Sequence, residues 1–304
     1  MEGLFLSLLF DRKLIVAVGD SVGGIVFDGS FKINGSVKRD IRASEPDSLD
    51  INFKNLSSQS RSLLNTHGMK ITVKAGYGDA TSVIFVGDIQ SCESIRNGTE
   101  WNTHVIAGDG AKAIAQSKLS KTYKDGTKLK DILEDAAASM GTTLNMVQAD
   151  FQDKKIKKSK VVQKQTRAHL DQMKMAYDFD WSIQNGAMII LPRGKSTNIE
   201  PYLISAKTGM IGGVEFFNEG GSKDTVKEGS GIGVKGKSLM LPDLTPGMKI
   251  VVESPSLEGE IGSHVFIVQG EKKVQGLYTV RNLQHTFDTD RSGGSFETSF
   301  EGII

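Results

Sequence analysis

Two prolines, Pro242 and Pro246, limit how the most recognisable motif of this chain can be interpreted. Residues 231–238, Gly-Ile-Gly-Val-Lys-Gly-Lys-Ser, match the phosphate-binding pattern G-x-x-x-x-G-K-[ST] at every fixed position. That mechanism needs a buried strand before the loop and a helix after it, so that the helix N-terminus faces the phosphates. Each proline inside such a helix would cost about 3 kcal/mol. A nucleotide-binding enzyme that uses Lys237 and Ser238 is therefore a remote alternative.

The same segment is better explained as β structure. We interpret 231–237 as the end of a flexible polar loop, because 218–229 upstream is rich in glycine and charged residues. Ser238–Leu241 is then a strand, and Met248–Glu253 is a second strand after the Pro/Gly turn.

Length and composition exclude several classes of protein. A chain of 304 residues suggests two domains, or three. Lys and Arg number 37 against 36 Asp and Glu, so net charge points neither to nucleic acid nor to an anionic membrane. Cys92 is the only cysteine, which excludes a disulfide framework and a multi-cysteine metal site. The apolar start, 1–10, lacks the basic region of a signal peptide, and we expect a soluble protein with a tucked-in or partner-docking N-terminus.

The two ends of the chain have the periodicity of strands. In the first third, one short helix is expected between the strands, at Ser57–Leu64. From about Ile204 onward the chain is again β-like. The predicted strands are Leu14–Val18, Phe31–Ile33, Ile71–Ala75, Val83–Val86 and Asn102–Ile106 in the first part, and Met248–Glu253, His264–Val268, Leu277–Phe287 and Ser295–Phe300 in the last part.

The middle, 111–193, has the pattern of a small α/β unit. Apolar residues from Leu129 to Met140 follow helical spacing, with Thr127 as the expected N-cap and Gly141 just past the end. A second helix is predicted over Arg167–Tyr177, and Asn185-Gly186 marks a tight hairpin. For 111–123 the pattern leaves helix and strand both open.

An internal similarity suggests that a small barrel is duplicated. Val86-x-x-Ile89-Gln90 followed by Trp101-x-Thr103-x-Val105 is similar to Val280-x-x-Leu283-Gln284 followed by Phe296-x-Thr298-x-Phe300. Each copy ends one β-rich half of the chain. The fold class we predict is mainly β with an α/β insertion. The domains are a first β-barrel with an N-terminal arm at 1–110, an inserted α/β domain at 111–195 and a second β-barrel at 196–304.

A search for chemistry gives no catalytic, cofactor-binding or metal-binding residue to nominate. His285-x-x-Asp288-x-Asp290 is the most metal-like cluster, but too few ligands converge at a recognised spacing. The basic run Lys154–Lys160 raises the hypothesis of nucleic-acid binding, yet no aromatic residue interrupts it. A solvated face that contacts an acidic protein neighbour is the favoured interpretation. The absence of an active-site pattern favours a structural or binding role.

Three ordered sets of residues resemble one known family. The first is Lys70–Gly78 with Ile84–Ile89, the second is Ile204–Gly212, and the third is Ser238–Val251 with Gly276–Val280 and His285–Asp288. Together they are similar to the central baseplate hub proteins of contractile phage tails, and the resemblance covers about residues 30–302. The same architecture occurs in the hub half of type VI secretion spike proteins.

The resemblance implies two tail-tube-like barrels around an α/β domain, and a homotrimer that matches a six-fold tail tube to a three-fold central spike. It implies as partners the tail tube protein above, a separate spike protein below and baseplate wedge proteins, with tape-measure proteins as further candidates. Genomic DNA would pass through a lumen without specific binding. The chain ends at Ile304, so the spike is expected to be a separate polypeptide. We expect a virion protein assembled in the host cytoplasm, with no membrane insertion and no enzymatic activity; a hub of a contractile injection or type VI secretion system is the alternative.

Overall fold

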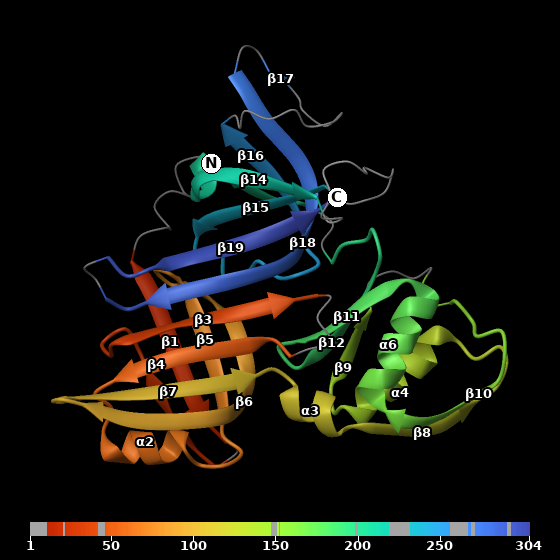
Figure 1. Ribbon diagram of the computed structural model, residues 1–304, viewed down its shortest axis with the longest axis horizontal. Coiled ribbons are helices and arrows are strands. Elements are labelled where there is room, and N and C mark those ends of the chain that lie inside the picture. Colours follow the sequence, from red (N-terminus) through yellow and green to blue (C-terminus); the bar gives the residue numbers. More distant parts are fainter. Residues whose placement is uncertain are drawn as a thin grey trace.

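A computed structural model of the chain describes residues 11–20, 22–41, 46–146, 151, 153–197, 200–218, 232–255, 267–268, 271–290 and 293–304. The fold is mainly β, as predicted, and most strands belong to large antiparallel sheets. Figure 1 shows strands stacked one above another, with a smaller helical part beside them. None of the described helices is long and apolar enough to cross a membrane.

One long sheet organises the molecule. Its strand order is β14-β15-β19-β18-β3-β4-β7-β6-β5-β1-β2, and every pair in this series is antiparallel. In addition, β16 pairs with β18 and with β13, and β17 pairs with β18. The strands are β1 (Arg12–Gly19), β2 (Gly24–Phe27), β3 (Ile33–Asp40), β4 (Ser48–Lys54), β5 (Lys70–Tyr77), β6 (Ala80–Asn97), β7 (Glu100–Gly108), β13 (Tyr202–Ser205), β14 (Met210–Asn218), β15 (Ile232–Leu239), β16 (Lys249–Pro255), β17 (Ile267–Val268), β18 (Glu271–Asp288) and β19 (Phe296–Ile303).

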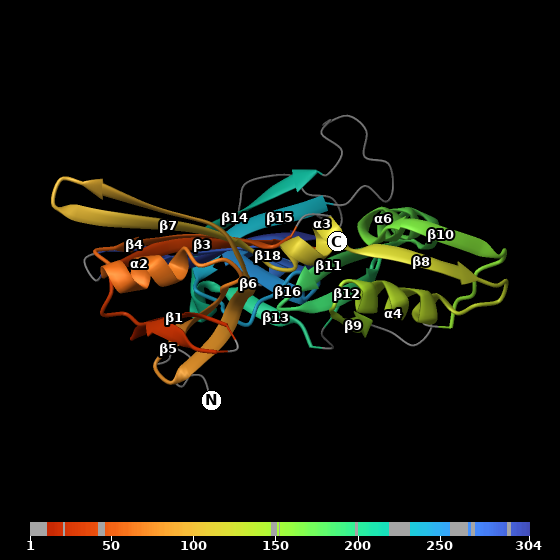
Figure 2. The ribbon, with the colours of Figure 1, turned by 90° about the horizontal axis from the view of Figure 1, so that it is seen from below.

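Two strands, β6 and β18, are unusually long and change partners halfway. Up to Asp88, β6 pairs with β5, and from Asp88 onward it pairs with β7. Up to Thr279, β18 pairs with β16, and from Thr279 onward it pairs with β19. The second halves form the hairpins β6–β7 and β18–β19, and β6–β7 projects far beyond the body of the molecule (Figure 2).

Buried and more exposed side chains alternate along the strands, so that one face of the long sheet is covered by two hydrophobic cores. The core under β1–β7 contains Phe27, Phe53 and Phe85, and the core under the C-terminal strands contains Val234 and Phe300. Full burial of each such side chain contributes about 1.5–3 kcal/mol. The tip of the β18–β19 hairpin also packs into the first core, through Phe287 and Phe296.

The middle of the chain forms an α/β unit with a core of its own, to the right in Figure 1. A three-stranded sheet, β11-β12-β9, and a two-stranded ribbon, β10-β8, pack with the helices. The elements are α3 (Ala111–Gln116), β8 (Lys118–Tyr123), α4 (Leu129–Ser139), β9 (Thr143–Met146), β10 (Lys160–Gln165), α6 (Thr166–Tyr177), β11 (Phe179–Gln184) and β12 (Ala187–Pro192).

Several local predictions, most of them in this unit, are confirmed. Gly141 follows the end of α4 with a φ of 67°, the left-handed conformation that ends many helices. Asn185 and Gly186 both have positive φ, 52° and 79°, as a two-residue hairpin turn requires. The predicted second helix corresponds to α6, and the helix predicted at Ser57–Leu64 is α2 (Ser58–Leu64), capped by the Ser57 side chain.

A buried polar cluster joins the α/β unit to the long sheet. Arg39 on β3 donates from Nε to Asp47 Oδ2 at 3.0 Å and from Nη2 to Gln184 Oε1 on β11 at 3.3 Å. Asp109, which follows β7, accepts a hydrogen bond from the Gly186 backbone N–H at 3.3 Å. Burial raises the pKa of Asp47 to about 6. Burial, and then the charge of Asp47, raise the pKa of Asp109 to about 7.

Other local predictions are wrong or need adjustment. Residues 232–237 belong to strand β15 and not to a flexible loop, because they pair on both sides with β14 and β19. Thr127 does not cap α4; its hydroxyl donates to the Lys124 carbonyl, and α4 begins two residues later. Segment 111–123 contains a helix and then a strand, α3 and β8. Strand β3 begins only at Ile33, and β2 and β4 were not predicted. The predictions for 1–10 and for most of His264–Val268 lie outside the described residues.

Candidate functional site

The face of the long sheet that points away from the two cores is polar along its length. From β14 to β6, the residues of this polar face follow one another across neighbouring strands in the pairing register. One row reads Glu215, Lys235, Glu301, Asn282 and Asp40. Another row reads Asn34, Asn52, His104 and Glu93. The polar face therefore carries positively and negatively charged side chains mixed with the side-chain amides of asparagine.

Charges on this face are largely paired across strands. Lys235 Nζ lies 2.7 Å from Glu301 Oε1, and Lys237 Nζ lies 3.0 Å from Glu297 Oε1. Nearer β6, His104 Nε2 lies 2.9 Å from Asp50 Oδ1. Partial burial disfavours the charge on Glu301, but hydrogen bonds from Lys235 and Asn282 outweigh it and lower the pKa of that carboxyl. The face presents charge without a strong net sign.

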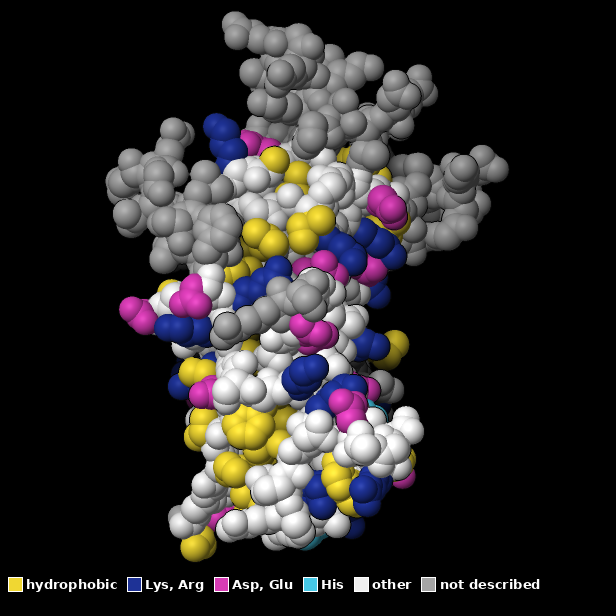
Figure 3. All heavy atoms as spheres, turned by 90° about the vertical axis from the view of Figure 1, so that its left-hand side faces the viewer, with side chains coloured by type: hydrophobic (Ala, Val, Ile, Leu, Met, Phe, Trp, Pro, Cys, Tyr) yellow, Lys and Arg dark blue, Asp and Glu magenta, His cyan; other side chains and the backbone are white. Residues whose placement is uncertain are grey.

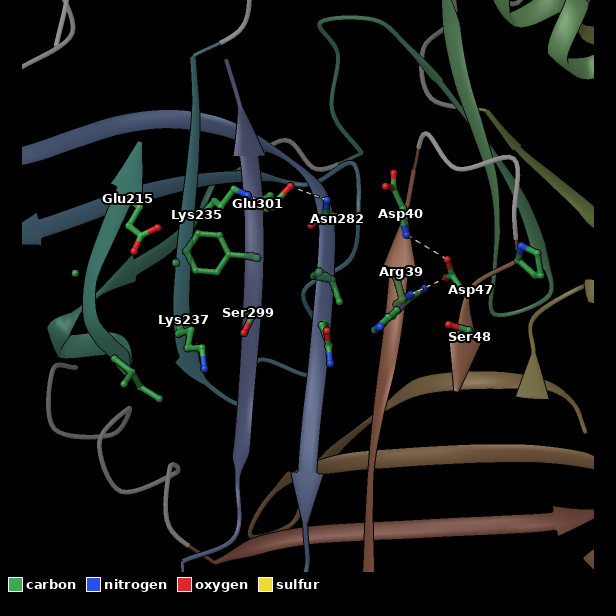
Figure 4. A pocket seen from close by; sticks show the side chains of 18 residues that line it. Arg39, Asp40, Asp47, Ser48, Glu215, Lys235, Lys237, Asn282, Ser299 and Glu301 are labelled. Carbon is green, nitrogen blue, oxygen red and sulfur yellow. Dashed lines mark hydrogen bonds and ion pairs between the residues drawn. The ribbon is translucent and has the colours of Figure 1, made fainter. Parts of the chain in front are cut away.

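Two hollows lie on the polar face. The larger, about 680 Å³, is lined by residues of β3, β14, β15, β18 and β19, among them Lys38, Asp40 and Ser299. Figure 4 shows most of its labelled side chains coming from these neighbouring strands, Asp47 and Ser48 at the start of β4 beside them, and Asn282 bonded to Glu301. The second hollow, about 570 Å³, lies at β4, β6 and β7 and is lined by Asp50, Glu93 and His104 among others. Neither is enclosed by helices or loops, and both are parts of one surface.

The phosphate-like motif does not form a phosphate-binding loop. Its described residues, 232–238, lie within β15, where Lys237 points to the polar face and pairs with Glu297. The next residue, Ser238, points to the opposite face and is fully buried. Because neighbouring side chains of a strand leave on opposite sides, these two groups cannot hold the same phosphate. No helix follows: β15 leads into a turn that contains Pro242 and Pro246.

The metal-like cluster is also dispersed. His285 is fully buried on the core side, and its Nδ1 lies 2.9 Å from Thr298 Oγ1. Burial, and then the charge of Arg39, lower the pKa of His285 to about 3. Asp288 instead caps its own turn by accepting from the Asp290 backbone N–H at 2.8 Å. Within the described part of the chain, no three His, Cys, Asp or Glu residues are grouped as metal ligands.

Two other sequence features lie away from the polar face. Cys92 is half-buried in β6, and burial raises the pKa of its thiol. The basic run from Lys154 to Lys160 lies in the α/β unit, before and at the start of β10.

Sequence reasoning identified no residue of the polar face as a site, although its signal is visible afterwards. Polar side chains recur at every second position in Asn34-x-Ser36-x-Lys38-x-Asp40, in Asp50-x-Asn52-x-Lys54 and in Glu297-x-Ser299-x-Glu301. Alternation of this kind shows that one face of each strand is solvated. It does not show that the strands are neighbours, because that depends on pairings between residues more than 200 positions apart, such as β18 with β3.

Comparisons with known proteins agree with the sequence resemblance. A model of the family described as baseplate hub gp41 matches residues 51–236, more than half of the chain. The comparison with curated protein sequences gives no match.

Solved structures of tail proteins share the fold. The 43 kDa tail protein of prophage MuSo2 from Shewanella oneidensis has a TM-score of 0.64 at 8% identity, and 96% of each chain is covered. The tail protein from Neisseria meningitidis MC58 has a TM-score of 0.62 at 10% identity, again with 96% of each chain covered. An Escherichia coli component of the type VI secretion system, described as similar to bacteriophage T4 tail proteins, has a TM-score of 0.55 at 11% identity over 89% of this chain and 73% of its own. Because the family model matches more than half of its residues, the chain belongs to the baseplate hub gp41 family of phage tail proteins.

Proposed function

We propose that this protein is a homotrimeric hub whose three copies close their long sheets into one ring, with the polar face lining a lumen for DNA. The ring would join a six-fold tail tube to a three-fold central spike, with wedge proteins on its outer side. In this proposal, 1–110 and 196–304 are two tail-tube-like barrels, and 111–195 is inserted between them. The observation that carries the proposal is that, at each end of the polar face, the outer edge of the last strand has no partner among the described strands.

Within one chain, the two β-rich halves are already joined by pairing between their edge strands. The second half of β18 pairs with β19 on one side and, on its other side, with β3 of the first half of the chain. The second half of β6 occupies the equivalent place in the first half of the chain. It pairs with β7 on one side, but among the described residues its other edge, 91–97, has no partner. At the far end of the sheet, β15 is the one described strand that pairs with β14.

The internal junction predicts how two copies would join. Strands β3 and β14 are equivalent, because each lies three places from the long bent strand in the orders β6-β7-β4-β3 and β18-β19-β15-β14. The β6 edge of one copy would therefore pair with β14 of the next, as β18 pairs with β3. Open strand edges with unused N–H and C=O groups are natural sites of strand addition.

Exposed apolar side chains support this seam. Transferring the β18–β3 register to β6 and β14 places Ile95 opposite Glu215 and Asn97 opposite Ile211. Ile95 is 55% exposed and Ile211 is 41% exposed in the single chain, although both lie in strands. Diagonal neighbours across a strand pair are within reach of each other. The seam would bring these two isoleucines together and remove apolar surface from water.

The charge pattern fits a passage for DNA and not a binding site. Affinity for the phosphate backbone comes from lysines and arginines that are free to replace counterions. Lys235 and Lys237 already pair with Glu301 and Glu297 across the strands. The end of the molecule opposite the α/β unit likewise shows both signs intermixed (Figure 3). Such a surface would let a polyanion slide without holding it.

The mass of the purified protein in solution tests this proposal. Mass photometry at low protein concentration should give a species of three times 32.9 kDa, and electron microscopy of it should show a central opening. Ile95→Lys should shift the species toward monomer, because it places a charge at the seam. A matched control, Val161→Lys, changes another exposed apolar strand residue, in the α/β unit, and should remain trimeric. A monomer as the sole species, with no binding to purified tail tube or spike protein, would overturn the proposal.

A hub of a type VI secretion or related injection system is the second candidate. It is favoured by the likeness to the Escherichia coli secretion component and to a Francisella PdpA-VgrG complex, the latter with a TM-score of 0.57. The family match and the two tail proteins with higher TM-scores favour the virion. Finding the protein by mass spectrometry in purified phage particles would decide for the virion, and finding it only in a secretion apparatus would decide for the alternative.

A further inference from the structure

A small cleft in the α/β unit has an apolar floor and a basic rim. Ile132 on α4, Ile156, and Met173 on α6 line it and are almost fully buried, at 1%, 6% and 2% exposure. Tyr177 completes the apolar part, and the cleft holds about 250 Å³. That is below the range of roughly 300–1,000 Å³ usual for small-molecule sites. It is large enough for one apolar side chain.

The rim consists of lysines without acidic partners. Lys157, Lys158 and Lys160 line the cleft, and none of them forms an ion pair with another described residue. Two lysines elsewhere in the same unit are neutralised, Lys121 by Asp135 at 2.7 Å and Lys128 by Asp153 at 2.8 Å. Among the described residues, the three rim lysines instead place unpaired positive charge around one small apolar cleft.

Neighbouring titratable groups respond to this excess of positive charge. Burial, and then repulsion from Lys164, lower the pKa of Lys160. Burial, and then the charges of Lys160 and Lys164, lower the pKa of the buried His169 to about 4. In both groups burial is the larger cause, and the positive charges of the β10 lysines add to it.

We propose that this cleft is a docking site for an acidic segment of a partner protein, which inserts one aromatic or aliphatic side chain between α4 and α6. Its acidic residues would then pair with Lys157, Lys158 and Lys160. A buried apolar anchor surrounded by complementary charges is a common design of protein interfaces. A nucleic acid fits less well, because single strands bind on several stacked aromatic rings, and among the described residues that line the cleft Tyr177 alone is aromatic.

This site is independent of the sheet edges that carry the hub proposal. It lies on the α/β unit, while the seam involves β6 and β14. Loss of binding here would leave the trimer intact, and loss of the trimer would leave this cleft intact. The two proposals can therefore fail separately.

Fluorescence anisotropy with labelled peptides tests the docking site on the full chain. The first probe is a short peptide of Asp and Glu residues around a central Trp, and the second has Gly in place of Trp. We expect the Trp peptide to bind at least ~10-fold more tightly than the Gly peptide, which corresponds to about 1.4 kcal/mol. Equal affinities would overturn the apolar part of the proposal, and no binding of either peptide would overturn all of it.

Charge-reversal variants test whether peptide affinity depends on the rim lysines themselves or only on the net charge of the protein. Lys157→Glu with Lys158→Glu should weaken the Trp peptide ~10-fold or more. The control, Lys112→Glu with Lys195→Glu, changes net charge equally at exposed sites away from the cleft and should change affinity less than ~2-fold. Equal losses in both variants would contradict a specific site. A single-stranded oligonucleotide of the same charge that binds the cleft more tightly than the Trp peptide would reassign it to nucleic acid.

Discussion

Gln90 and Arg281 occupy equivalent bulges in two hairpins separated by nearly 200 residues. Gln90 is the one residue of β6 left over between the pairs Ile89–Ala107 and Ser91–Ile106. Arg281 is left over in the same way in β18, between Val280–Gly302 and Asn282–Glu301. Each bulge lies two residues after the point where its strand changes partners. The two hairpins therefore share their bend, their bulge and their register. They differ in that β3 pairs with the outer edge of β18, whereas no described strand pairs with the outer edge of the second half of β6.

The pH dependence of stability is a first prediction. Asp109 has an ordinary pKa of 3.8 in the unfolded chain and one of about 7 in the folded protein, so the folded state binds more protons between these values. Stability should therefore be highest below about pH 4 for this group, and should fall as pH rises toward 7.

Asp109→Asn tests the origin of that dependence. The amide oxygen can still accept from the Gly186 N–H, but it carries no buried charge. Urea unfolding at pH 8 should show a gain of about 1–2 kcal/mol, with a flatter pH profile. Asp79→Asn, at a fully exposed carboxylate, should leave the profile unchanged. A loss of stability at pH 8 in Asp109→Asn would mean that the carboxylate is stabilising there.

The Arg39–Asp47 ion pair gives a second prediction. Both side chains are almost completely buried, at 1% and 3% exposure. Arg39→Met leaves the Asp47 carboxylate buried without its cation, and should cost about 3–5 kcal/mol in thermal unfolding. The double variant Arg39→Met with Asp47→Leu should recover most of this loss, since no unpaired charge remains. An equal loss in the single and double variants would point to packing and not to charge.

The phosphate-like motif gives a third prediction. Lys237 is half exposed and pairs with Glu297 on the neighbouring strand. Isothermal titration with MgATP should show no binding to either wild type or Lys237→Ala, and the variant should unfold within about 0.5 kcal/mol of wild type. Measurable ATP affinity that Lys237→Ala abolishes would revive the enzyme hypothesis.

Local sequence signals are sufficient to predict those features that depend on residues close together in the chain, such as turns and helix ends. Asn185-Gly186 specified a hairpin turn, and Gly141 marked the end of α4. The second strand of the internal repeat was aligned as the structure has it, with Trp101 equivalent to Phe296 and Val105 to Phe300. These features depend on residues close together in the chain.

Long-range pairing was not visible in the same way. For the first strand of the repeat, the sequence alignment is three residues out of register. It matches Val86 with Val280 because both are valine. In the structure the residue equivalent to Val280 is Ile89, since each of these two directly precedes its bulge. Residues 232–237 resemble a loop in sequence, since four of the six are glycine or lysine. They form a strand because β14 and β19 supply hydrogen bonds from both sides. The polar face was missed because it exists only once eight strands are assembled.

Cysteine cross-linking across the proposed seam tests the central claim most directly. In a Cys92→Ala background, Ile95→Cys with Glu215→Cys places two thiols opposite each other only if β6 of one copy pairs with β14 of the next. The control pairs Ile95→Cys with Lys235→Cys, one strand further away, where the Cα atoms would be too distant for a disulfide. Mild oxidation and non-reducing gel electrophoresis should give covalent trimers for the first pair and monomers for the control. Monomers from both pairs, or equal cross-linking in both, would contradict a ring closed by β6 and β14.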